Sequence, residues 1–281
     1  MDRDDPGLVV EPLGKAAALD FIDMLAHAPA DVAGLSGSGD EIRHPVDSLR
    51  LLPPVAAPSK IIAVGRNYRA HAAESGSDVP TEPMLFGILP SALCGPNADI
   101  VLPPQSAKID WEGELAVVIG RRARQVKRKD ALAHVAGYMV MNDVSARDLQ
   151  RRDGQWTRAK SFDGFKPCGP WLSSAAAIGL ARDLRITVRV NGTTMQDSTT
   201  AMMVFPVDEL IEFISAFCTL LPGDIIATGT PDGVGFGQTP ERYLNPGDVV
   251  EAEIEGLGRL TNRFVVPAVA ANGGEGGHGF D

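Results

Sequence analysis

The chain has 281 residues, of which 44% are hydrophobic and 22% are charged, a composition typical of a folded globular protein and unlike that of a disordered one. Lys and Arg number 26 against 36 Asp and Glu, so the formal net charge is −10. This charge disfavours a nucleic-acid partner, because the overall field repels polyanions.

Residues 1–58 differ in composition from the rest and predict a small N-terminal domain. Residues 15–25 are rich in Ala and Leu with a possible helical period, residues 34–39 form a Gly/Ser turn, and residues 51–58 are rich in proline. Proline at that density cannot join a helix or a central strand, so the domain is expected to end in a semi-rigid linker. The acidic N-terminus does not resemble a secretory signal, and no uncharged apolar stretch approaches the ~20 residues of a membrane span. We therefore expect a cytoplasmic protein without a membrane partner.

The three cysteines, Cys94, Cys168 and Cys218, show no CxxC spacing. This pattern fits neither a disulfide framework nor a thiolate zinc site, and it favours a reducing compartment.

Residues 59–268 carry short runs rich in β-forming residues, most of them bounded by Gly, Pro or Asn, which is typical of a sheet-rich domain. These runs are 61–65, 84–89, 114–119, 138–141, 185–190, 224–228, 249–254 and 263–266. The alternating run 185–190 meets Asn191-Gly192, which predicts a β-hairpin. Helical patterns are fewer, at 130–135 and 207–217, so an α+β, β-rich fold is expected. The glycine-rich residues 269–281 predict a disordered tail.

The segment 109–120 holds carboxylates at alternate positions, Asp110, Glu112 and Glu114. In a strand these side chains share one face, with neighbours roughly 6 to 7 Å apart. Like charges beside a buried apolar run are costly unless a cation lies between them, and Mg²⁺ or Mn²⁺ prefers such oxygen ligands. Asp143, which follows the run 138–141, could supply a third ligand.

A solvated face of an amphipathic strand explains the same alternation, so the residues alone leave both interpretations open. A glycosidase pair is disfavoured, because carboxylates two positions apart on one strand point the same way and cannot flank a scissile bond. If a helix starts at Asp143, then Arg147 and Gln150 share a face with it. That arrangement would place a metal ligand, a cation and an amide toward a substrate.

A short helix is expected at 67–74, and it would place His71 and Glu74 at i and i+3. A carboxylate that orients an imidazole makes a competent general base toward a metal-polarised water. The polar loop 75–83 follows, so this element could act as a lid. Taken alone, a histidine in this position is more often structural.

Lys160 follows Trp156 closely and could meet a substrate carboxylate or a developing enolate, although such lysines are usually plain surface. The glycine-rich segment 227–237 could present backbone N–H groups and the Thr230 hydroxyl to an anion, or it could be a tight structural turn. It lacks a Walker lysine and no helix follows it, so nucleotide binding is disfavoured.

Five segments, taken in order, resemble the fumarylacetoacetate hydrolase family. They are 61–68, 111–115, 142–150, 160–163 and 228–231. The resemblance covers about residues 58 to 266 and is more specific to the family than to a reaction. It implies a mixed β-roll, β-sandwich-like catalytic domain behind a small N-terminal domain, usually as a homodimer.

The resemblance also implies roles for individual residues, and it weighs against the solvated-strand interpretation. Mg²⁺ or Mn²⁺ would be bound by Glu112, Glu114 and Asp143. His71 and Glu74 would form the family's lid dyad, with Lys160 as a further catalytic residue. The implied substrate contacts are Arg66, Arg147, Gln150 and Thr230. One departure is Ile88, where many members carry a lysine, and it puts in doubt any substrate whose carboxylate that lysine would meet.

The expected activity is metal-dependent hydrolysis of a carbon–carbon bond in a 1,3-dicarbonyl or 2,4-dioxo acid, an acylpyruvate for example. The same enolate chemistry would serve a tautomerase or isomerase of 2-hydroxy-dienoic acids, or an oxaloacetate-type decarboxylase. A catalytically silent binder of small molecules is the alternative from another class. In each case the partner is a small keto or enol acid.

Overall fold

The computed structural model describes residues 50–267. The predicted helix at 15–25, the turn at 34–39 and the tail at 269–281 therefore lie outside the described residues. Within the described part of the chain, no helix is long and apolar enough to cross a membrane.

The centre of the domain is a mixed sheet of seven strands in the order β2-β1-β12-β6-β7-β9-β3. The strands are β1 (Ile61–Gly65), β2 (Met84–Ile88), β3 (Leu93–Cys94), β6 (Gly113–Ile119), β7 (Val135–Asn142), β9 (Lys166–Ser174) and β12 (Ile225–Ala227). Every residue of β6 is buried, because the sheet is covered on both faces at that point. The largely apolar sequence of β6 is what such a central position requires.

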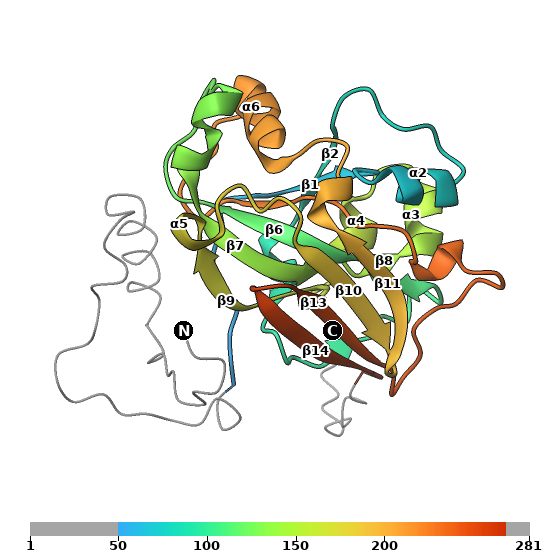
Figure 1. Ribbon diagram of the computed structural model, residues 1–281. Helices are drawn as coiled ribbons and strands as arrows, with labels where there is room; N and C mark the ends of the chain where they lie inside the picture. The colour runs from blue at the N-terminus through green and yellow to red at the C-terminus, as the bar shows by residue number, and fades with distance from the viewer. Residues whose placement is uncertain (1–49, 268–281) are drawn as a thin grey trace, which may run out of the picture.

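A second sheet of five strands, in the order β11-β10-β13-β14-β4, packs against the first (Figure 1). Its strands are β4 (Ile100–Val101), β10 (Arg185–Val190), β11 (Thr193–Thr199), β13 (Val249–Ile254) and β14 (Gly258–Val265). Alternate residues of β10 and β13, such as Val188 and Ala252, share one apolar core with Leu115 and Val117 of β6. This face-to-face packing is that of a β-sandwich. A short pair of strands, β5 (Ile109–Asp110) and β8 (Ser145–Ala146), stands apart from both sheets.

Helices lie at the margins of the sandwich (Figure 1). The α-helices are α2 (Arg69–Glu74), α3 (Arg147–Asp153), α4 (Thr157–Lys160), α5 (Ala175–Ile178) and α6 (Val207–Phe217). The 3-10 helices are η3 (Pro90–Ala92), η4 (Arg128–His134), η5 (Thr200–Met202) and η6 (Gly235–Gly237). In the view of Figure 1, the short helices α2 and α3 are drawn on the same side of the sandwich, and α6 is drawn toward the other side.

The predicted bounds of β1, β10, β13 and α6 agree with the structure. The predicted hairpin is present, and Asn191 and Gly192 have φ values of 51° and 77°, as a type I′ turn requires. Two of the expected elements differ from the structure. The helix expected at 130–135 is the 3-10 helix η4, because Val135 already pairs with Ile119 as the first residue of β7. The single strand expected at 109–120 is interrupted between Asp110 and Gly113.

Candidate metal centre and pocket

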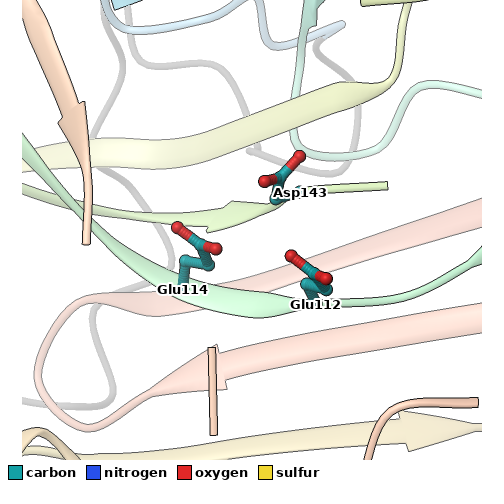
Figure 2. A group of neighbouring side chains, drawn as sticks. All are labelled: Glu112, Glu114 and Asp143. Carbon is teal, nitrogen blue, oxygen red and sulfur yellow. The ribbon is translucent and has the colours of Figure 1, made fainter. Parts of the chain in front are cut away.

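Three buried carboxylates, those of Glu112, Glu114 and Asp143, point into one space at the end of β6 and β7 (Figure 2). Their ligand atoms all lie within 4.8 Å of one another. The register of the sheet explains this arrangement, since Gly113 pairs with Asn142 and the backbone N–H of Asp143 donates to the Glu112 carbonyl at 2.8 Å. These three residues, called the triad below, are 5%, 2% and 0% exposed, so the solvated-strand interpretation is wrong.

Asp110 does not join the triad, although strict alternation would place it on the same face. The interruption after β5 turns its side chain away. Its carboxylate accepts the backbone N–H groups of Gly235 at 2.6 Å and Phe236 at 3.1 Å, and it pairs with Arg147 Nε at 2.8 Å. The role of Asp110 is therefore to anchor a loop and an arginine.

Buried cations surround two members of the triad. Lys160 Nζ lies 2.6 Å from Glu112 Oε2 and 2.9 Å from Asp143 Oδ2. Arg147 Nη2 lies 2.6 Å from Glu112 Oε1, and Lys166 Nζ lies 2.8 Å from Asp143 Oδ1. Burial by itself would raise the pKa of Glu112, but the charges of Lys160 and Arg147 outweigh it and hold that pKa at about 2. Glu112 is therefore ionised at neutral pH.

Glu114 has a different environment. Its Oε2 accepts the backbone N–H of Gly229 at 2.9 Å, and no side chain among residues 50–267 forms an ion pair with it. Burial raises its pKa well above the usual range, and the charges of Asp143 and Glu112 raise it further. A divalent cation between the three carboxylates would remove this repulsion. The oxygen-only donor set fits a hard cation of the Mg²⁺ or Mn²⁺ type, and it does not distinguish the two.

A pocket of about 350 Å³ opens over Glu112 and Glu114. Most of the site residues predicted from the sequence line it, namely Arg66, His71, Glu112, Glu114, Arg147, Gln150, Lys160 and Thr230. Two others lie behind this lining: Asp143, which is fully buried, and Glu74, which contacts His71. The structure thus brings the predicted residues together, while their individual roles stay predictions.

His71 and Glu74 lie on α2, within the short helix expected there. His71 Nδ1 is 3.3 Å from Glu74 Oε2, and the other oxygen of Glu74 accepts the backbone N–H of Gly233 at 3.0 Å. The imidazole also packs edge-on against Phe236, with ring centroids 5.9 Å apart. Glu74 is therefore fixed at both oxygens and in turn orients the ring at the pocket wall.

The predicted alignment of Asp143 with Arg147 and Gln150 on one helix is wrong. Helix α3 begins only at Arg147, because Ser145 and Ala146 form β8 and pair with β5. Arg147 and Gln150 nevertheless meet, with Nη1 donating to Oε1 at 3.0 Å. Both line the pocket from α3.

The backbone N–H groups of the glycine-rich loop 227–237 donate to carboxylates of the protein itself, where the sequence analysis expected a bound anion. Its backbone N–H groups at Gly229, Gly233 and Gly235 donate to Glu114, Glu74 and Asp110 in turn. The Thr230 hydroxyl, also expected to meet a ligand, donates to the Gly113 carbonyl and accepts from Gln196, both at 2.9 Å. The loop therefore positions site residues from three separate elements.

Ile88 lies outside the pocket, in the smaller apolar core, with 3% exposure. The sequence analysis missed several residues of the pocket region. Lys166 belongs to no recognised pattern, and the aromatic residues Phe86, Trp156 and Phe236 line the pocket without any regular spacing.

The model of the fumarylacetoacetate (FAA) hydrolase C-terminal family matches residues 60–265. The chain belongs to this family. It is 48% identical over 223 residues to the mitochondrial oxaloacetate tautomerase FAHD2A of Bos taurus, covering 79% of this chain and 71% of the relative. It is 44% identical over 257 residues to the 2,4-didehydro-3-deoxy-L-rhamnonate hydrolase of Sphingomonas sp. (strain SKA58), covering 91% and 88%.

Among solved structures, the 2-hydroxyhepta-2,4-diene-1,7-dioate isomerase from Mycobacterium marinum superposes with a TM-score of 0.71 at 42% identity, covering 82% of this chain and 83% of that chain. The family and fold predicted from the ordered motifs are thus confirmed. The relatives include a tautomerase, a hydrolase and an isomerase, so membership alone does not fix the reaction.

Proposed function

We propose that the protein is a divalent-metal-dependent enzyme that interconverts the keto and enol forms of a short 2-oxo acid. The observation that carries this proposal is the buried carboxylate triad at the wall of a pocket that also holds cations and a histidine–glutamate pair. The similarity to an oxaloacetate tautomerase supports it. A cation bound by Glu112, Glu114 and Asp143 would supply Lewis-acid stabilisation of negative charge on the oxo-acid oxygens.

The side chains of the pocket supply the proton transfer. His71, oriented by Glu74, removes a proton from the carbon next to the keto group, and the Glu74 carboxylate stabilises the imidazolium that forms. The electron pair of the broken C–H bond moves into the new C–C double bond, and the negative charge develops on the former keto oxygen. Lys160 holds a positive charge at the same wall. Return of the proton from His71 to that oxygen completes the enol.

Hydrolysis of a carbon–carbon bond in a 2,4-dioxo acid is the second candidate. The same His71–Glu74 pair could deprotonate a water in place of a substrate carbon. The similarity to a rhamnonate hydrolase over most of both chains favours this alternative. Decarboxylation of an oxaloacetate-type acid would need the cation but no activated water.

Product analysis separates these reactions. Oxaloacetate is incubated in D₂O with the metal-loaded protein, the EDTA-treated protein or buffer, and proton NMR follows deuterium exchange at C3 and any release of pyruvate. An acylpyruvate is tested in parallel in ¹⁸O-labelled water. Metal-dependent exchange without pyruvate supports tautomerisation, whereas ¹⁸O in the acid released from the acylpyruvate supports hydrolysis. Rates equal to buffer with both substrates would overturn the proposed function.

A further inference from the structure

Lys166, the first residue of β9, is buried beside the triad but does not line the pocket. It is 0% exposed. A lysine is almost never buried so completely unless its charge is paired, because an isolated ammonium group is costly to remove from water. No step of the proposed proton transfer involves Lys166, and a ligand in the pocket does not meet it. Its contacts within the protein must therefore explain its position.

The pairing of β7 with β9 places Lys166 opposite Asp143. Met141 pairs with Cys168 in this antiparallel ladder, so two further steps along both strands bring Asp143 to face Lys166. Side chains at opposite positions of antiparallel strands have Cβ atoms roughly 4.5–5.5 Å apart, close enough for opposite charges to interact. The register of the sheet therefore delivers the lysine to this one carboxylate of the triad.

Three oxygen atoms surround the Lys166 ammonium group. Nζ donates to the carbonyls of Val144 at 2.8 Å and Phe165 at 3.0 Å, and it lies 2.8 Å from Asp143 Oδ1. The two carbonyls belong to segments that are themselves joined, since the Val144 N–H donates to the Phe165 carbonyl at 3.1 Å. An ammonium group has three N–H donors and no acceptor. The backbone therefore fixes the position of Nζ, with one donor left for the carboxylate.

The two oxygens of Asp143 have different neighbours. Oδ1 faces Lys166, whereas Oδ2 lies 2.9 Å from Lys160 Nζ. Lys160 Nζ also lies 2.6 Å from Glu112 Oε2, so Oδ2 is the oxygen on the side of the triad. A carboxylate that is held at one oxygen cannot rotate freely, and its other oxygen keeps its direction. Lys166 thus restrains the ligand atom that Asp143 offers to a cation.

We propose that Lys166 is a positioning residue, which fixes Asp143 through Oδ1 so that Oδ2 can bind the divalent cation. The inference rests on the proposed function, which assigns the cation to the triad. The charge of Lys166 also repels a cation, so removing it has two opposing effects. The loss of orientation prevails, because a fully buried carboxylate that loses one counter-charge turns toward the remaining one, on Lys160.

Titration calorimetry with Mn²⁺ tests this inference on the wild type, Lys166→Met and a control, Ile254→Ala. Methionine has a side chain of similar length without N–H donors. Ile254 is 1% exposed in the second sheet and does not line the pocket. Its truncation should cost about 2–5 kcal/mol, similar to the cost of about 3–5 kcal/mol for breaking a buried ion pair. The control therefore matches the loss of stability, which urea denaturation in EDTA verifies, and leaves the triad untouched.

Lys166→Met is expected to raise the Kd of Mn²⁺ about 10- to 100-fold, as the loss of a group that orients a metal ligand predicts. Ile254→Ala should stay within about threefold of the wild type. If Lys166→Met does not fold, Lys166→Gln, which keeps an N–H donor but has no charge and a shorter side chain, should also raise the Kd. A wild-type or tighter Kd in the folded Lys166 variant, or an equal weakening in Ile254→Ala, would overturn the inference.

Activity at saturating Mn²⁺ gives a second criterion. Because Lys166 does not line the pocket, Lys166→Met should then exchange deuterium at C3 of oxaloacetate within about threefold of the wild-type rate. A rate that stays low with the metal site filled would contradict a role through the metal ligand.

The two proposals can fail separately. If the wild type binds Mn²⁺ but exchanges oxaloacetate no faster than buffer does, the proposed function fails, and the Kd values still decide the role of Lys166. If the wild type is active and the Kd is the same in Lys166→Met, only the role of Lys166 is refuted. A wild type that binds neither Mn²⁺ nor Mg²⁺ would overturn both.

Discussion

Replacing Glu114 by Gln removes one charge from the triad and keeps the shape of the side chain. Glu114 is 2% exposed, and its carboxylate oxygen accepts the Gly229 N–H at 2.9 Å, a bond that an amide oxygen can also accept. Burial and the neighbouring carboxylates already raise the pKa of Glu114. In EDTA we therefore expect Glu114→Gln to unfold at the same temperature as the wild type or slightly higher.

With metal present, the two proteins should differ. At a metal concentration of 100 times Kd, the wild type gains about 2.7 kcal/mol. Loss of even an outer partner of a metal site costs 10- to 100-fold in affinity, so loss of a ligand should cost at least about 100-fold. The same concentration then equals the new Kd and leaves about 0.4 kcal/mol. At about 2–4 °C per kcal/mol, the metal-induced rise in Tm falls from roughly 5–10 °C to about 1 °C.

The assay is thermal unfolding with EDTA, Mg²⁺ or Mn²⁺, accompanied by activity measurements on the same samples. Glu82→Gln is the control, because Glu82 is exposed and lies outside the pocket. We expect Glu114→Gln to lose both the metal-induced rise and the activity, and Glu82→Gln to keep both. A metal-induced rise of wild-type size in Glu114→Gln would show that this carboxylate is not a ligand.

Two further variants test, respectively, a residue proposed for proton transfer and a residue proposed to stabilise the fold. His71→Ala should keep the metal-induced rise in Tm and lower kcat by about 10²- to 10⁴-fold, as the loss of a general base predicts; a parallel loss of metal binding would contradict that role. Lys166→Met leaves Asp143 Oδ1 without its buried cation, so urea denaturation should show a loss of about 3–5 kcal/mol. The control Lys129→Met, at an exposed position, should leave the free energy of unfolding unchanged. If Lys166→Met also leaves it unchanged, the pair with Asp143 does not stabilise the fold.

Local patterns were sufficient to predict much of this fold and part of the site. The strand β10 follows from its alternation and from the Asn-Gly turn after it, and α6 follows from its apolar face. The alternation of Glu112 and Glu114 and the place of Asp143 after a strand only made a metal site possible, and the family resemblance assigned the three residues as ligands. Pairing of β6 with β7 brings them together. The elements predicted correctly from the residues alone are those whose pattern lies within one short segment.

The remaining features depend on contacts that no local pattern encodes. Asp110 is turned away from the triad by N–H groups of the loop 227–237, including that of Gly235, which lies 125 positions later in the chain. Trp156 and Phe86 are far apart in sequence but pack against each other. Arg66, whose own backbone has a left-handed conformation, lies over the Trp156 ring, and no local sequence pattern predicts that conformation. Lys166 could not be singled out from the sequence, because its importance comes from its buried ion pair with Asp143.

The interruption between β5 and β6 has a testable consequence at Asp110. Its carboxylate accepts from Gly235 and Phe236 and also from Arg147, whose Nη2 contacts Glu112. An asparagine at this position has one acceptor oxygen and an NH₂ group, so it must leave one of these buried donors unpaired.

Asp110→Asn should therefore lower the free energy of unfolding by about 3 kcal/mol in urea denaturation. It should also raise the KM of the substrate, because Arg147 and Phe236 lose their anchor at the pocket wall. The Kd of Mn²⁺ should stay within about threefold of the wild type, since the triad keeps its three carboxylates. Metal binding weakened as much as in Glu114→Gln would mean that Asp110 acts as a ligand, and that the interruption of the strand does not separate it from the triad.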